Sequence, residues 1–92
     1  MISKELELYY RNMYRMFASD GWKQLQEDLQ NNATVINSVE LTKDNDDLRF
    51  RKGQLAVIAS LLNLEAQIEA AEAQATEEAE EEEEEEAAEV VA

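Results

Sequence analysis

Residues 22–64, WKQLQEDLQNNATVINSVELTKDNDDLRFRKGQLAVIASLLNL, decide the fold of this chain. The chain has no proline, and its glycines occur only at positions 21 and 53, so little interrupts a helix. No part of it sustains the alternation of β-branched and polar residues that indicates a strand. The sequence therefore predicts an all-α protein.

This stretch predicts two helices joined by a short connection. In the first helix, about residues 20–41, the apolar residues form close to one stripe: Leu25, Leu29, Ala33, Ile36 and Val39. Residues 42–47, TKDNDD, are turn formers whose acids suit the first turn of the next helix. That second helix, about residues 46–70, has two neighbouring apolar stripes, a face too broad for one partner helix.

We expect these two helices to form an antiparallel hairpin in which residues equidistant from about position 43 meet. Leu29 then lies near Ile58, and Gly53 lies opposite Ala33. A glycine inside a helix costs about 1 kcal/mol relative to alanine. A close backbone approach to Ala33 would compensate for that cost, and the alternative is a tolerated surface glycine.

An amphipathic helix at about residues 3–18 is expected to precede the hairpin, with Ser3 as its N-cap. Residues 19–21, Ser-Asp-Gly, would end it and start the next helix. Its apolar stripe is rich in aromatic residues and methionine: Leu6, Tyr9, Tyr10, Met13, Met16 and Phe17. Such a stripe either packs on the hairpin or docks on another chain, because these residue types are also enriched at interfaces.

The composition changes near residue 70. Eleven of the 22 acidic residues, and none of the eight basic ones, follow that position, and the net charge of -14 therefore lies mainly in residues 71–92. Like charges repel at helical neighbour positions, so the Ala/Glu-rich tail with its run Glu80–Glu86 is expected to be disordered. Residues 1–70 would form a helical interaction module. A module of this size is marginal alone, and oligomerisation or a partner is the usual remedy.

Several classes of function have no support in the sequence. Without histidine or cysteine, the usual general base, the thiolate metal site and the disulfide are absent. Asp44 and the acids after it lack the glycine and glutamate of a calcium loop, and Arg51-Lys52-Gly53-Gln54 lacks the order of a phosphate loop. We expect no catalytic, cofactor-binding or metal-binding residues, and no enzyme.

The sequence also argues against two kinds of partner. The amino-terminal segment has no apolar run of signal-peptide length, and no segment has the length of a membrane span, so no membrane partner is expected. The negative charge argues against direct nucleic-acid binding.

Two segments carry a resemblance to a known class of proteins. They are Gly21–Leu29, GWKQLQEDL, and Asp47–Leu55, DLRFRKGQL, followed by Leu61–Glu65. Over about residues 15–68 the chain resembles short helical proteins encoded among the head and tail genes of tailed bacteriophages, particularly short-tailed ones. The resemblance implies a component of the virion or its assembly that binds a larger structural protein through helices.

The expected function is that of a non-enzymatic structural or assembly protein, located in the virion or in the host cytoplasm. Its partner would be a capsid, portal or tail protein, or other copies of itself in an oligomer. The alternative is an acidic inhibitor, mimicking DNA charge, that occupies a basic site on a host protein. Trp22 is a candidate anchor of the partner interface. The other expected interface residues are Leu25, Leu29, Leu55, Ile58, Leu61, Leu62 and Leu64 on the hairpin, with Tyr10, Met13 and Phe17 on the first helix.

Overall fold

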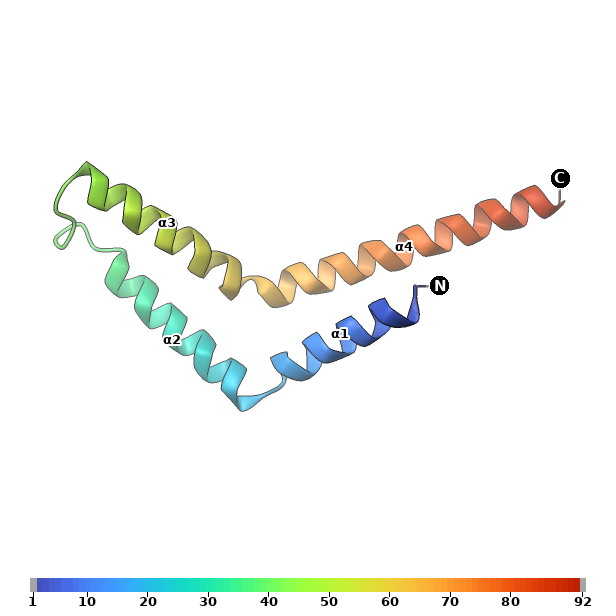
Figure 1. The fold of residues 1–92 in the computed structure, drawn as a ribbon, viewed down its shortest axis with the longest axis horizontal. Coiled ribbons are helices and arrows are strands. Elements are labelled where there is room, and N and C mark those ends of the chain that lie inside the picture. Colours follow the sequence, from blue (N-terminus) through green and yellow to red (C-terminus); the bar gives the residue numbers. More distant parts are fainter. Residues whose placement is uncertain (1, 92) are drawn as a thin grey trace. The chain divides into compact units, whose positions relative to one another are not determined.

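The structure is a computed structural model that describes residues 2–91 of the 92-residue chain. Within those residues it has four α-helices: α1 (Lys4–Phe17), α2 (Asp20–Ile36), α3 (Asn45–Leu62) and α4 (Leu64–Val91) (Figure 1). The same residues include no β-strand. The prediction of an all-α protein is confirmed.

The helices belong to two compact units. One unit joins the residues up to Met16 with those from Glu65 onward, and the other comprises Phe17–Leu64. The second unit is the predicted hairpin, in which α2 packs against α3. The first unit contains most of α1 and α4. The change in composition near residue 70 falls inside α4, away from the boundary between the units.

Two hydrogen bonds fix the antiparallel register of the hairpin. The side-chain amide of Gln26 donates to the carbonyl of Leu61 at 3.3 Å, and the Arg51 guanidinium donates to the carbonyl of Ile36 at 2.9 Å. Both pairs are equidistant from a position between residues 43 and 44. The predicted register, with Leu29 near Ile58, is therefore confirmed.

Side-chain caps begin the first three helices. The Ser3 hydroxyl accepts from the backbone N–H of Leu6 at 3.1 Å, and the Ser19 hydroxyl accepts from that of Trp22 at 3.2 Å. The Asp44 carboxylate accepts from the backbone N–H of Asp47 at 2.8 Å. Each cap satisfies an N–H that has no partner inside its helix. The predicted first helix and the capping role of the connection acids are thus confirmed.

The ends of the two hairpin helices differ from the prediction. α2 ends at Ile36 rather than near residue 41, because Asn37 caps it and the Ser38 side chain accepts the backbone N–H of Leu41 at 3.2 Å. Such local side-chain bonds replace helical ones. α3 ends at Leu62 rather than near residue 70, and Asn63 caps it before α4 begins.

Of the two interpretations of Gly53, the close approach to Ala33 is wrong. A Cβ added at Gly53 would meet no atom within 4 Å, and the residue is exposed. Gly53 is therefore a surface glycine in the middle of α3, which was the alternative interpretation.

In the other unit, α1 lies alongside the first part of α4 (Figure 1). The Tyr14 hydroxyl donates to Oε1 of Glu72 at 2.9 Å. On α1, Tyr10 is also buried, at 5% exposure. On α4, the buried Ile68 is followed by the half-buried Glu72, Ala75 and Ala79, at helical spacings.

The prediction of a disordered tail is not confirmed, because α4 continues as a helix from Leu64 to Val91. Alanine and glutamate both have high helix propensity, and the part of α4 that meets α1 supplies the costly first turns from which a helix extends. The glutamates of the run Glu80–Glu86 are all exposed, so their carboxylates stay hydrated.

Candidate functional site

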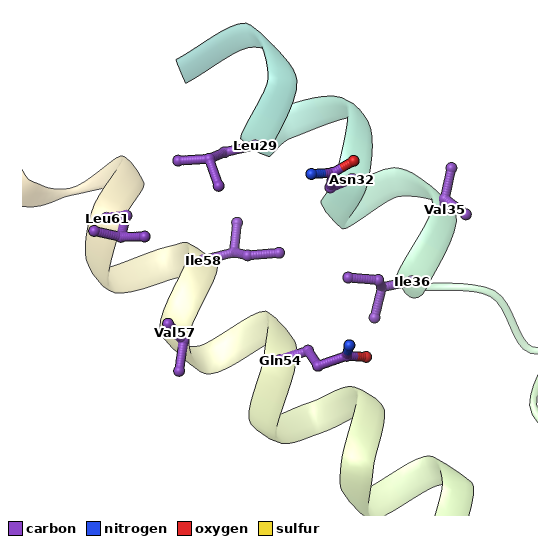
Figure 2. A pocket seen from close by; sticks show the side chains of 8 residues that line it. All are labelled: Leu29, Asn32, Val35, Ile36, Gln54, Val57, Ile58 and Leu61. Atoms are coloured by element: carbon purple, nitrogen blue, oxygen red, sulfur yellow. The ribbon is translucent and has the colours of Figure 1, made fainter. Parts of the chain in front are cut away.

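An apolar groove runs between α2 and α3. Figure 2 shows side chains from both helices extending into the space that separates them, Leu29 and Ile36 from α2 and Gln54 and Ile58 from α3. The groove is open to solvent and has a volume of about 590 Å³. Its lining consists of Leu29, Asn32, Val35 and Ile36 on α2 with Gln54, Val57, Ile58 and Leu61 on α3. None of these eight side chains carries a charge.

The edges of the groove are apolar and strongly exposed. Val35 on α2 is 64% exposed, and Val57 on α3 is 62% exposed. Phe50, at 65%, lies seven residues before Val57 and so extends the same stripe of α3, while Leu25, at 45%, lies one turn before Leu29 on α2. Exposed apolar side chains that adjoin one another commonly mark a protein-binding surface.

The composition of α3 explains why one neighbouring helix leaves this surface open. The last ten residues of α3, Gly53–Leu62, carry no charge. A helix that is apolar on every side is normally buried on every side. Yet none of the residues of α3 is buried, because α2 covers only one of its faces.

The structure places the expected interface residues in several environments. Leu25 and Leu61 are exposed, and Leu29 and Ile58 are half-buried in the groove. Leu55 lines a separate hollow beside the connection, with Ile36 and Lys52. Leu62, Leu64 and Met13 are half-buried, and Tyr10 is buried.

Trp22 lies in the interior, at 7% exposure, where its ring packs on Phe17 with centroids 5.1 Å apart and planes tilted by 51°. Phe17 is itself buried, at 9% exposure. Both aromatic rings therefore support the hairpin unit from within, and their surfaces are largely withdrawn from solvent. Trp22 stabilises the unit that carries the groove.

The expected interface set lacked five of the eight groove residues and one exposed neighbour: Asn32, Val35, Ile36, Gln54 and Val57, with Phe50 beside them. Val35 lies off the main stripe of α2, and the two amides are polar, so hydrophobic periodicity gives them no weight. Phe50 lies between basic residues in the sequence, so the sequence pattern does not assign it to the apolar stripe of α3. Their shared position becomes visible only when α2 and α3 are set side by side.

The connection between α2 and α3 is held by Arg51. Its guanidinium donates to the carbonyl of Ile36 at 2.9 Å, to the carbonyl of Leu41 at 3.2 Å and to the Asp47 carboxylate at 3.1 Å. The same carboxylate accepts the backbone N–H of Lys43 at 3.0 Å. The hydrogen bond from Lys43, and next that from Arg51, lower the pKa of Asp47 below its usual value. This cluster, which we call the Arg51 clasp, sets the geometry at one end of the groove.

The contact between α1 and α4 also affects a titratable group. Desolvation, together with the hydrogen bond and the negative charge of Glu72, raises the pKa of Tyr14 to about 12. The Tyr14 hydroxyl is therefore protonated at neutral pH and acts as a donor to Glu72. A fixed donor of this kind ties two helices together and gives no nucleophile for chemistry near pH 7.

Other kinds of site are not found in the part of the chain that the structure describes. Residues 2–91 contain no group of three or more metal-ligating side chains placed to hold an ion. None of the described helices is both long enough and apolar enough to cross a bilayer.

Comparisons of the chain with protein-family models, with curated proteins and with solved structures give no match.

Proposed function

We propose that this chain is a non-enzymatic helical assembly protein whose α2–α3 hairpin associates with other protein chains through the apolar groove. The uncharged, exposed groove is the observation that carries this proposal. Its apolar lining suits another protein's side chains, because burying such surface is the main driving force of protein association.

The resemblance of residues 21–29 and 47–55 to short helical phage proteins suggests the setting. In this proposal the chain belongs to a tailed bacteriophage of the short-tailed kind. It acts either in the virion or in the host cytoplasm during assembly. The protein contacted by the assembled chain is a capsid, portal or tail protein.

Affinity capture of the full chain from infected cells, followed by mass measurement of the intact complex, tests this function. The expected result is a multimer that contains a capsid, portal or tail protein. The variant Val57→Glu, which places a charge at the groove edge, should lose that partner. Val39→Glu makes the same change at a site in the connection that is 91% exposed and outside the groove, and it should keep the partner. Capture of a single host enzyme, or equal behaviour of the two variants, would refute the proposal.

A second candidate function is an acidic inhibitor that occupies a basic site on a host protein. Mimicry of nucleic-acid charge needs acids held on a folded surface. The run Glu80–Glu86 lies on α4 with every side chain exposed, which favours this candidate. Deleting residues 80–92 leaves Glu72 in place to hold Tyr14. That deletion should abolish binding for an inhibitor, and it should leave the assembly intact for a groove-docking protein.

A further inference from the structure

No segment of the unit Phe17–Leu64 packs over the groove face of the hairpin. Its edge residues Val35, Phe50 and Val57 are each more than 60% exposed. Monomeric proteins rarely leave contiguous apolar patches larger than a few hundred Å² in water. Small helical units commonly resolve this problem by association.

The charge of this unit permits association between identical chains. Residues 17–64 carry seven acidic and five basic residues, so the hairpin is close to neutral. The large negative charge of the chain lies instead on residues 71–92. The groove lining is uncharged, so two copies meeting face to face would bury no ion there. A strongly basic or acidic partner would gain nothing from this lining.

The size of the face also suits a dimer. With 18 residues, α3 is about 27 Å long, and two adjacent helices are about 20 Å wide, which gives a flat area on the order of 500 Å². The accessible surface of a face formed by helical ridges and grooves exceeds its flat area. It is therefore of the same order as the roughly 800 Å² that each partner buries in a stable interface.

We infer that a second copy of this chain occupies the groove. The exposed stripe of α3 consists of Phe50, Val57 and Leu61. In a dimer with a two-fold axis, this stripe of each copy packs into the groove of the other copy. The product is a four-helix bundle made from two hairpins. Asn32 and Gln54 are the polar members of the lining, and their amides supply hydrogen bonds that fix the register of the two copies.

This inference rests on the proposed function in one respect, since both treat the groove as a protein-binding surface. It goes further by stating that the isolated chain already fills that surface. A purified chain without any phage component therefore tests the inference, whereas capture from infected cells tests the function. A monomer that still captures a capsid, portal or tail protein through Val57 would overturn the inference and leave the function standing.

Sedimentation equilibrium of the purified full chain is the experiment. The expected mass is twice the 10.5 kDa of one chain. Val57→Glu should weaken the dimer by at least about 100-fold, because the two-fold axis buries the new charge in both copies. Val39→Glu should leave the dimer unchanged. Circular dichroism of each variant checks that the helices remain.

Two results would overturn the inference. One is a mass of 10.5 kDa at every concentration, whether the groove is then bare or covered by α1 or α4 of the same chain. The other is a dimer that Val57→Glu does not weaken. Should Val57→Glu lose its helices, Val35→Gln on the opposite edge makes the same test without a charge, and an undiminished dimer there would equally overturn the inference.

Discussion

Replacing Arg51 with alanine removes the clasp that joins the end of α2 to the start of α3. Two of its hydrogen bonds run from a charged guanidinium to the backbone carbonyls of Ile36 and Leu41. Near the surface each contributes about 1 kcal/mol, below the roughly 1.5–3 kcal/mol typical of hydrogen bonds to charged groups. The side chain of Arg51 is 19% exposed, and its bond to Ile36 is partly buried whereas its bond to Leu41 is exposed. Its ion pair with Asp47 is an i, i+4 pair near the surface and adds little. The expected loss is therefore about 2 kcal/mol in the free energy of unfolding.

Urea denaturation followed by circular dichroism measures this loss. Arg51→Lys should retain at most about half of the stabilisation, because one ammonium group does not span both carbonyls as a planar guanidinium does. Arg49→Ala removes the same charge from an exposed position two residues away and should change the stability by less than about 0.5 kcal/mol. If Arg51→Ala and Arg49→Ala unfold at the same urea concentration, the clasp does not stabilise the hairpin.

Four further predictions concern other features. Because the pKa of Asp47 is lowered in the folded state, its stabilisation is complete above the unfolded pKa and is lost as the pH falls through the lowered value. The stability difference between wild type and Asp47→Asn, measured by urea titrations at several pH values, should therefore be present at neutral pH and vanish in acid. A difference of the same size at both pH values would contradict this prediction. Trp22→Ala should cost about 3–5 kcal/mol and abolish cooperative thermal unfolding, and a stable variant would contradict its interior position. Gly53→Ala should stabilise α3 by about 0.5–1 kcal/mol in thermal melts, since open space surrounds the new methyl group, and a loss of stability would show a close contact there. Raising the salt concentration should increase the circular dichroism signal of the helix at residues 80–86 by screening its glutamates, and the deletion of residues 80–92 should remove that increase.

The hairpin could be predicted from the sequence because its determinants are local. The apolar stripe of α2, the turn formers at residues 42–47 and the caps Ser19 and Asp44 each favour the same structure. The positions at which the helices end could be predicted less well. Asn37 and Asn63 cap α2 and α3 by donating their backbone N–H groups to the carbonyls of Ala33 and Ala59, and the periodicity of apolar residues carries no information about such bonds.

The pairing of α1 with α4 could not be predicted from the apolar pattern. Beyond the buried Ile68, the half-buried residues of α4 are small or charged: Glu72, which accepts from Tyr14, then Ala75 and Ala79. Composition alone assigns such residues to a solvated tail. Only their spacing of three and four residues, continued from Ile68, indicates a common face.

The candidate site was predictable in part. The breadth of the apolar face on α3 indicated that a single helix would not cover it, and Ile58 and Leu61 do line the groove. The assignment of Trp22, Tyr10 and Phe17 to a partner interface stays a prediction, and the structure gives all three a buried position. Aromatic residues are frequent both in interiors and at interfaces, so residue type alone does not separate the two environments.

The most direct test of the groove as a contact between copies is an isotope-filtered nuclear Overhauser measurement. Equal amounts of labelled and unlabelled full chain are mixed, so that the observed signals join protons of different molecules. Signals between the methyl groups of Val57 or Leu61 in one copy and those of Leu29 or Val35 in the other are the predicted result. A spectrum in which these methyl groups contact only residues of their own chain would contradict it.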